Sequence, residues 1–498
     1  MIKPTQFTPS GCCGRVNRRV FLADCGMGFT GVVLGAMLQR DGILRASSAE
    51  VWTLPDGKPH FTPKAKSVIW LFMQGGVSHL DTFDPKPALN KYAGKAIGET
   101  PYKDVLDSPL VKKNVRESDV GSLKLRSKIF PMQVGYRKFG QSGIELTDWW
   151  PHLGNCIDDI ALIRSVWTSD NDHTAQLQFH TGRHIFDGFF PSIGSWVHYG
   201  LGSLNDNLPQ FVVLGEQNGP CCGGPGATGA SYLGPEHSGV QLEVDPDNPL
   251  PYAFPGPGVY QEEQQRTFEF LKQLNQFATV RYPDDPAMRA RIKSYELAFR
   301  MQTAIPEVFR FSEESEATRR LYGLDREETK SFGQRCLTAR RLVERGVRFV
   351  QVYHGGGSAT LWDAHAELQK NHSKMSTQVD QPIAGLLRDL KQRGLLEQTL
   401  VVWGTEFGRS PGVEGTKEGR DHHPFGFSVW MAGGGIKGGV AHGATDELGF
   451  HAVEHRHYVT DIHATVLQQL GLDASKLEVP GQKRLQIDFG KPIYDIIA

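Results

Sequence analysis

Histidine and carboxylate side chains gather in the C-terminal half of the chain, where their spacing suits metal binding. Ten of the 18 histidines lie between His354 and His463. After the apolar segment 347–353 the chain reads Trp-Asp-Ala-His, which places Asp363 and His365 two residues apart. Residues at positions i and i+2 of an extended segment point the same way, so these two side chains can bind one ion together. We therefore predict that Asp363 and His365 are metal ligands.

Three further candidate ligands stand beside two other apolar segments. Glu406 follows the segment 400–403, while Asp421 and His422 precede the segment 427–431. Imidazole and carboxylate ligands together suit zinc, manganese or iron. The expected cofactor is a divalent metal, with zinc, manganese and calcium as candidates. Such a metal polarises a phosphoryl or sulfuryl oxygen and activates water or a hydroxyl.

A possible nucleophile lies in the run Asp172-His173-Thr174, between the apolar segment 160–163 and a short helical stretch. A helix N-terminus presents free N–H groups that suit an oxyanion. Thr174 or Asp172 is therefore a candidate nucleophile, and His173 joins them in the predicted catalytic group. Asp, Asn and Thr are also favoured helix caps, so a purely structural role stays open.

Two arginines complete the predicted catalytic set. Arg409 and Arg420 lie beside the candidate ligands Glu406 and His422, and a guanidinium group is suited to gripping an anionic ester. A surface loop is the alternative for the segment with adjacent histidines at 422 and 423.

Other polar groups have simpler interpretations. Three residues after the segment 67–73 are either ligands or turn-capping groups, namely His79, Asp81 and Asp84. Four histidines in a polar segment are expected to be solvated surface groups: His442, His451, His455 and His457. His463 has apolar neighbours in a helical pattern and is expected to be structural.

The elements that must position these residues are short apolar strands alternating with helices. Runs bounded by Gly or polar residues predict buried parallel strands, and helical patterns cover 379–393 and 459–470. An α/β fold with helices on both faces of a sheet follows. Ligands bind at the carboxyl ends of strands in such sheets, which is where the candidate residues lie. The strand candidates are 67–73, 160–163, 211–214, 347–353, 400–403 and 427–431.

The chain is predicted to consist of an export signal and one large domain. Residues 1–49 contain Arg18-Arg19, an apolar Gly-rich stretch at 25–38, and small residues at 47–49, in the order of a twin-arginine signal. Residues 50–498 then form a single α/β domain, in which 261–345 is a helical insertion. We expect a periplasmic or secreted protein with no stable membrane insertion after processing. The net charge of −1 argues against a nucleic-acid partner.

Four motifs together resemble a known family. They are the run 74–87 (QGGVSHLDTFDPKP), the WDAH run at 362–365, the GTEFGR run at 404–409 and the GRDHH run at 419–423. The chain resembles the exported domain-of-unknown-function 1501 family, common in planctomycete-type bacteria. That family is similar to sulfatases and other members of the alkaline phosphatase superfamily. The resemblance implies a mostly parallel sheet sandwiched by helices.

The chain departs from the superfamily pattern on one metal half-site. The resemblance implies a histidine ligand where Phe407 stands, an aspartate where Gln74 stands, and a nucleophile near Asp172, where the chain has neither Cys nor Ser. The other half-site is expected to persist on Asp363, His365 and His422, with Glu406 as a fourth ligand.

Two functions remain open at this point. The first is an exported, metal-assisted hydrolase of sulfate or phosphate esters, whose partner is an anionic substrate such as a sulfated or phosphorylated glycan. In this interpretation Thr174 or metal-activated water attacks, and Arg409 or Arg420 steadies the anion. The alternative is a non-catalytic secreted binding or scaffold protein that keeps the fold.

Overall fold

The computed structural model describes residues 55–108, 128–217, 219, 223–245, most positions of 262–274, and 286–355, 361–414, 417–482 and 484–498. Pro55–Ala498 forms one compact unit. The predicted export signal, residues 1–49, lies outside the described residues. Among the helices of the described part, none has the length and apolar character that crossing a membrane requires.

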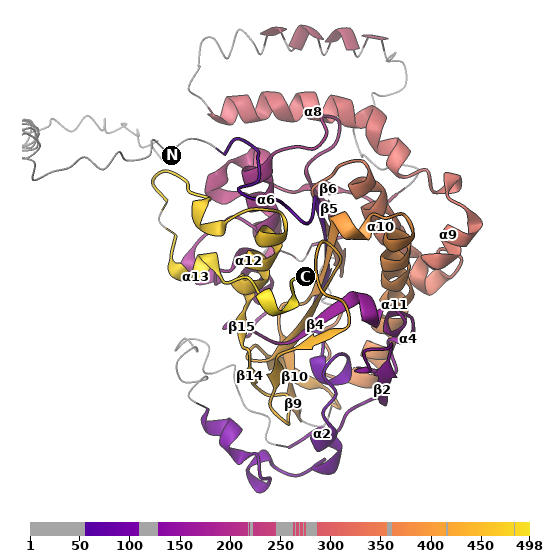
Figure 1. The fold of residues 1–498 in the computed structure, drawn as a ribbon, viewed down its shortest axis with the longest axis vertical. Coiled ribbons are helices and arrows are strands. Elements are labelled where there is room, and N and C mark those ends of the chain that lie inside the picture. Colours follow the sequence, from indigo (N-terminus) through magenta and orange to yellow (C-terminus); the bar gives the residue numbers. More distant parts are fainter. Residues whose placement is uncertain are drawn as a thin grey trace, which may run out of the picture. The chain divides into compact units, whose positions relative to one another are not determined.

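A central sheet of nine strands organises the described part of the chain (Figure 1). The strand order is β12-β4-β11-β8-β1-β7-β5-β6, and β15 also pairs with β4. Only β11 runs antiparallel to its neighbours in this sheet. The strands are β1 (Ser67–Met73), β4 (Ile160–Trp167), β5 (Phe211–Leu214), β6 (Val240–Leu242), β7 (Phe349–His354), β8 (Thr399–Gly404), β11 (Phe427–Ala432), β12 (Val440–His442) and β15 (His457–Tyr458).

The central strands form because their sequences are apolar on both faces. Alternate residues of β1 enter two different cores, with Ile69 and Leu71 on one face and Trp70 and Phe72 on the other. All seven residues of β1 are buried. A strand buried on both sides reads as a continuous apolar run, which is the pattern that predicted it. The predicted α/β class with a mostly parallel sheet is confirmed.

Helices cover both faces of the sheet (Figure 1). The core that contains Ile69 also contains side chains of α4 (Pro151–Gly154), α10 (Glu327–Glu344) and α11 (Leu368–Gln392). The core that contains Trp70 contains side chains of α5 (Ala175–Thr181), α6 (Ile193–Leu201) and α12 (Val459–Gln469). The sheet therefore lies between two helical layers.

The remaining elements are shorter or lie outside these layers. Between β6 and β7 the described chain is largely helical, and α10 of this stretch packs directly against β7 and α11. The other helices are α2 (Pro87–Lys91), α8 (Pro286–Val308), α9 (Glu316–Leu321) and α13 (Gln486–Phe489). Three hairpins are formed by β2 (Tyr136–Phe139) with β3 (Ile144–Thr147), β9 (Gly408–Val413) with β10 (Arg420–His423), and β13 (Ala444–Thr445) with β14 (Ala452–Glu454).

Strand direction brings five loops to one edge of the sheet. The parallel strands β1, β4, β7 and β8 all end there. Because β11 is antiparallel, it begins at the same edge, and the preceding β10 delivers its residues to that edge as well. The segments that follow or precede these strands hold the candidate site residues.

A buried carboxylate links the two helices α4 and α11. Asp380 of α11 accepts hydrogen bonds from the backbone N–H groups of His152 (2.8 Å) and Leu153 (2.7 Å) in the first turn of α4. Burial raises the pKa of Asp380 to about 6, against the opposing effect of these hydrogen bonds. The folded protein therefore binds a proton at Asp380 more tightly than the unfolded chain does. This proton stabilises the folded state fully below the pKa of Asp380 in the unfolded chain, and the stabilisation is lost as the pH rises through 6.

We predict that wild type loses stability relative to Asp380→Asn as the pH rises from 4 to 7. The expected change in the difference between their free energies of unfolding is about 2 kcal/mol, because one pKa unit corresponds to roughly 1.4 kcal/mol. Urea unfolding of both proteins at several pH values measures it. A difference that stays constant across this range contradicts the prediction.

Candidate active site

Five segments far apart in sequence meet at the edge where the parallel strands end. They are the glycine loop after β1, the loop between β4 and α5, the segment after β7, the segment after β8, and the hairpin β9–β10. In that hairpin His422 lies opposite Arg409, and His423 lies opposite Gly408. The structure brings together all five predicted metal ligands and His173 of the predicted catalytic group.

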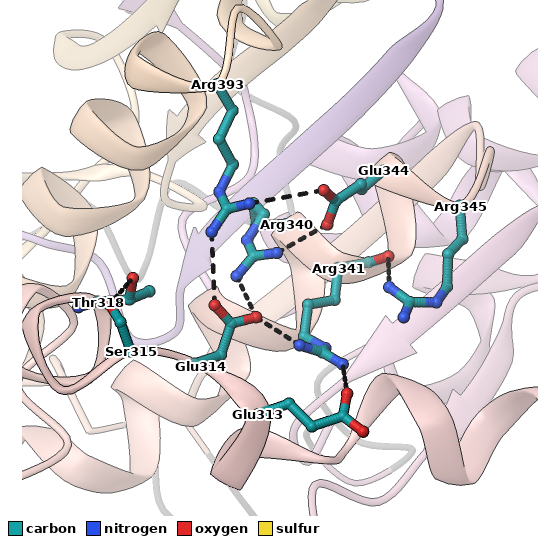
Figure 2. Close-up of a pocket in the computed structure, with 9 residues that line it drawn as sticks. All are labelled: Glu313, Glu314, Ser315, Thr318, Arg340, Arg341, Glu344, Arg345 and Arg393. Atoms are coloured by element: carbon teal, nitrogen blue, oxygen red, sulfur yellow. Dashed lines mark hydrogen bonds and ion pairs between the residues drawn. The ribbon is translucent and has the colours of Figure 1, made fainter.

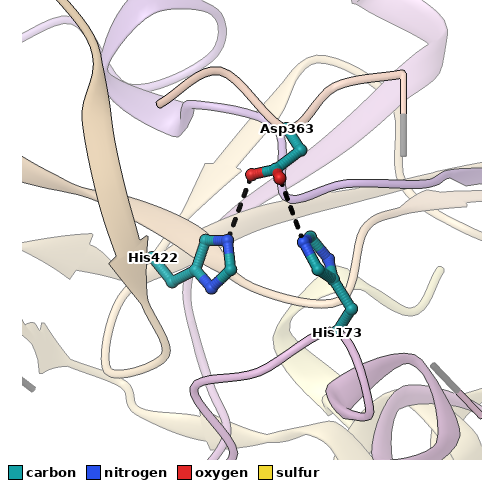
Figure 3. Close-up of side chains that lie close together, drawn as sticks. All are labelled: His173, Asp363 and His422. Atoms are coloured by element: carbon teal, nitrogen blue, oxygen red, sulfur yellow. Dashed lines mark hydrogen bonds and ion pairs between the residues drawn. The ribbon is translucent and has the colours of Figure 1, made fainter. Parts of the chain in front are cut away.

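Three potential ligand atoms form a tight triangle. The Nε2 atom of His422 lies 3.1 Å from Oδ1 of Asp363, and the Nε2 atom of His365 lies 3.0 Å from the same oxygen. The two Nε2 atoms are 3.0 Å apart. Figure 3 shows Asp363 between His422 and His173. The predicted ligands Asp363, His365 and His422 thus converge on one point.

The hydrogen-bond partners of Nδ1 in His365 and His422 determine whether the Nε2 atom of each ring carries a hydrogen or a lone pair. Nδ1 of His422 lies 2.9 Å from the carbonyl oxygen of Asn171, and Nδ1 of His365 lies against the carboxylate of Glu414. Because carbonyls and carboxylates accept hydrogen bonds, each Nδ1 carries the hydrogen in the neutral ring. Each Nε2 then directs a lone pair at the other and at Asp363. A proton or a metal cation between them removes the repulsion, so the donor set fits a divalent metal.

Carboxylates surround the outer side of His365. Besides Glu414, Asp421 lies 3.9 Å from Nδ1 of His365. The side chains of His365, Glu414 and Asp421 can bring one ligand atom each within 4.8 Å of one another. Asp421, predicted as a ligand, therefore lies behind His365, and its Oδ1 accepts the backbone N–H of His422 at 2.9 Å.

His173 differs from the other two histidines because both of its ring nitrogens face carboxylates. Nε2 lies 3.2 Å from Asp363 and Nδ1 lies 3.2 Å from Glu406. Burial by itself lowers the pKa of His173, but these two hydrogen bonds outweigh it and raise the pKa to about 9. The ring is therefore a doubly donating cation at neutral pH, placed beside the triangle.

Asp363 carries the negative charge at the centre of the site. Burial raises its pKa, but the contacts with the rings of His173, His365 and His422 and the charge of Arg409 lower the pKa far below the usual range. The carboxylate therefore stays ionised at any physiological pH.

Glu406 is fully buried and contacts both the glycine loop after β1 and His173. Its Oε1 accepts a hydrogen bond from the backbone N–H of Gly75 at 2.7 Å, and its Oε2 lies 3.2 Å from the hydroxyl of Thr405. The same Oε1 faces His173. These contacts place Glu406 on the far side of His173 from the triangle, where it fixes the glycine loop and the histidine.

Arg409 is a structural brace of the site. Its guanidinium group is fully buried and donates to the carbonyl oxygens of Gly75, Gly76 (2.7 Å) and Arg420 (3.0 Å), and to Oδ1 of Asp363 (2.7 Å). Gly76 has a φ of +79°, and a side chain there would collide with the ring of Phe407. The loop after β1 is therefore held close to Asp363 by one arginine.

Arg420 points away from the triangle. It is fully buried, and its Nε donates to Asp81 at 2.8 Å. Its terminal nitrogens donate to four backbone carbonyl oxygens, those of Ser410 (3.3 Å), Pro411 (3.1 Å), Pro131 (2.9 Å) and Phe130 (3.3 Å). These bonds fasten β10 to the segment around residue 130.

The two candidate nucleophiles differ in their surroundings. Asp172 is exposed, and its carboxylate accepts the N–H of the next residue, His173. The hydroxyl of Thr174 donates to Oδ2 of Asp170 at 2.7 Å, and Asp170 is buried. Thr174 thus has a hydroxyl already paired with a carboxylate base, as an activated nucleophile requires.

Several residues of the site were not among the predicted ones. Glu414, Asp170 and the carbonyl group of Asn171 each orient a side chain of the cluster. Glu414 follows β9, and its N–H donates to Gly419 at 2.9 Å across the hairpin turn. The run of Gly, Thr, Lys and Glu between 412 and 419 is a hairpin signal that points to this placement.

Some histidines expected at the surface are buried. His442 and His451 are both buried, which corrects their interpretation as solvated groups, because strands pair around them. His79 is also buried, and desolvation lowers its pKa to about 4. Its Nε2 lies 2.7 Å from the carbonyl oxygen of Gly449.

A cavity of about 630 Å³ lies between α10 and the segment around residue 314, apart from the candidate active site (Figure 2). Its arginines face glutamates: Arg340 (2.6 Å), Arg341 and Arg393 (3.4 Å) all contact Glu314. No histidine is among the described residues that line it. Because Arg340, Arg341 and Arg393 are paired with Glu314, we interpret the lining of this cavity as an ion-pair network between helices.

One family model matches most of the chain. The family model described as "Protein of unknown function (DUF1501)" matches residues 65–497. No relative among curated proteins matches the sequence.

Solved structures match at low identity. The phosphonate monoester hydrolase SpPMH from Silicibacter pomeroyi is 13% identical, with a TM-score of 0.32, covering 67% of this chain and 73% of its own. The PsFucS1 sulfatase from Pseudoalteromonas sp. is 12% identical, with a TM-score of 0.29, and the match covers 70% of this chain and 66% of the sulfatase chain. A protein in the alkaline phosphatase superfamily from Vibrio parahaemolyticus is 10% identical, with a TM-score of 0.31, and the match covers 91% of this chain and 77% of that protein's chain.

We predict that Arg420→Met destabilises the protein by about 3–5 kcal/mol, because it leaves the Asp81 carboxylate buried without its partner. The double variant Arg420→Met/Asp81→Asn is expected to lose less, since no unpaired charge remains. Urea unfolding followed by tryptophan fluorescence measures both. A double variant that loses the sum of the two single effects contradicts this role of Arg420.

Proposed function

The chain belongs to the DUF1501 family, and we propose that it is an exported, metal-assisted hydrolase of sulfate or phosphate esters. The observation that supports this proposal is the triangle of Asp363 Oδ1, His365 Nε2 and His422 Nε2, with 3.0–3.1 Å between its atoms. Export through the twin-arginine pathway belongs to the same proposal and rests on residues 17–49.

Asp363, His365 and His422 are the residues that would hold the metal. A bound zinc or manganese ion would polarise an ester oxygen and make a nearby hydroxyl or water more acidic. Glu414 and Asn171 hold the two imidazoles in the tautomer that a ligand needs. Arg409 keeps Asp363 in place through the 2.7 Å contact to its Oδ1.

His173 and Thr174 supply the remaining chemistry. His173, held between Glu406 and Asp363, offers a positive charge next to the triangle, where an anionic substrate would gain negative charge during the reaction. In this proposal the Thr174 hydroxyl attacks, and Asp170, which accepts its hydrogen bond, takes its proton. The substrate class is an anionic ester, such as a sulfated or phosphorylated glycan.

We predict that the wild-type protein carries stoichiometric divalent metal, and that Asp363→Ala and His422→Ala each lose one equivalent. Each substitution removes one corner of the triangle, and the two remaining ligands bind a metal far more weakly. Metal content after loading with zinc or manganese and gel filtration, measured by inductively coupled plasma mass spectrometry, tests this. His60→Ala, which removes an exposed histidine outside the cluster, serves as the control. Wild-type protein without bound metal contradicts the proposed site.

We predict that Thr174→Ala lowers kcat by about 100-fold or more, with the metal content unchanged, while Thr174→Ser keeps most of the activity. A panel of aryl phosphates and aryl sulfates with added zinc or manganese identifies the substrate for this measurement. Full activity of Thr174→Ala contradicts attack by its hydroxyl. Anion binding by metal-loaded wild type without turnover of any ester favours the non-catalytic alternative.

A further inference from the structure

A second group of histidines lies along β4, the strand that carries the loop of Thr174. Both β12 and β15 pair with β4 in parallel, one after the other: His442 is opposite Ile163, and His457 is opposite Val166. The hairpin β13–β14 leaves the sheet between these two pairings. The base of the hairpin is therefore bounded by His442 on one side and by His455 and His457 on the other.

The side chains at this base converge. His442, His455 and Asp495 bring one ligand atom each within 4.8 Å of one another. Nδ1 of His442 lies 4.0 Å from Oδ2 of Asp495, and the rings of His442 and His455 lie 5.0 Å apart. The His442 side chain is 7% exposed whereas that of Asp495 is 70% exposed, so the group opens to solvent on one side.

A chain of hydrogen bonds orients His442. Nδ1 of His457 lies 3.0 Å from the carboxylate of Asp461, which accepts, so this Nδ1 carries the hydrogen. Nε2 of His457 then accepts from Nε2 of His442 at 2.9 Å. In this arrangement Nδ1 of His442 has a free lone pair on the side of Asp495. An imidazole whose other nitrogen donates to a partner is the usual form of a histidine metal ligand.

Two further contacts fix the other members of the group. The hydroxyl of Ser165 in β4 donates to the carbonyl oxygen of His455 at 2.7 Å. The segment of Asp495 is joined to the sheet beside β12, because the N–H of Lys437 donates to Ile496 at 2.8 Å. The three side chains therefore come from three anchored segments, as a metal site requires.

We propose that His442, His455 and Asp495 form a zinc-type site, separate from the triangle at Asp363, in which solvent completes the coordination. Two imidazoles and one carboxylate suit zinc or cobalt. An ion there joins both ends of the hairpin 443–454 and the segment of Asp495. Its role is to stabilise structure, since binding to the folded state alone raises the folded state's stability.

The hairpin connects this site to the proposed active site. Near its tip, the carbonyl oxygen of Gly449 lies 2.7 Å from Nε2 of His79, and that of Phe450 contacts the ring of His423. His423 is the neighbour of His422 in β10. A cation at the base of the hairpin would thus stabilise the packing that supports the ligand-bearing strand β10.

The test uses the full chain with Asp363→Ala, so that the triangle no longer binds metal. Titration of this variant with zinc or cobalt is expected to show one equivalent bound, with a rise in Tm. Adding His455→Asn or Asp495→Asn is expected to weaken that binding by about tenfold or more and to abolish the rise in Tm. Asn is chosen at 455 because His455 has a φ of +44°, which Asn tolerates.

Controls separate this site from the active site and from misfolding. His60→Ala in the same background is expected to bind and respond as the background does. Unchanged binding and an unchanged rise in Tm in the His455→Asn and Asp495→Asn variants would overturn the proposal, whatever the outcome at Asp363. Both altered side chains lie at the surface, so the metal-free Tm of the variants is expected to match the background.

Discussion

The carboxylate of Asp363 is the interaction on which the site depends. Three imidazoles and one guanidinium group surround it, and they come from the loop after β4, the segment after β7 and the hairpin β9–β10. A partly buried charge of this kind must be compensated, because an unpaired carboxylate away from water is costly. The same compensation draws the loop after β4, the loop after β8 and the hairpin β9–β10 onto the segment after β7. Charge balance at one residue thereby assembles the site.

Sheet topology makes that compensation possible. In a fully parallel sheet, the residues that precede any strand lie at the edge where all strands begin, which is opposite to the edge where they end. The reversed direction of β11 brings the residues that precede it to the edge where β1, β7 and β8 end. His422 reaches Asp363 only for this reason. The hairpin β9–β10 then uses Arg409 and Arg420, both fully buried, to bind backbone carbonyl oxygens around the site.

Much of this arrangement was predictable from the sequence. Buried strands are continuous apolar runs, so β1, β5 and β8 were located closely, and the ligand candidates stood at their ends. The direction of β11 was not predictable, because a strand buried on both faces has the same composition in either direction. The partners of Arg420 were also inaccessible, since an arginine that meets backbone carbonyls has no sequence signal.

The histidines of β12 and β15 also show a limit of prediction from the sequence. His442 and His457 have polar neighbours in the sequence, which predicted solvated groups, yet short edge strands pair them onto β4. Two or three residues of strand carry too little periodicity to be recognised.

The two histidine clusters differ in what a cation contributes. At Asp363 the ligand atoms already lie 3.0–3.1 Å apart and an arginine and a charged histidine adjoin them, so positive charge is concentrated around one carboxylate. A cation bound there sits among groups suited to binding an anion. At His442 a lysine contacts only the backbone, since Nζ of Lys437 donates to the carbonyl oxygen of Asp495 at 3.2 Å, and the Asp495 carboxylate is largely exposed. In the functions we propose, the same ligand types thus serve chemistry where the surroundings are positive and buried, and serve only to tie segments together where they are open to water.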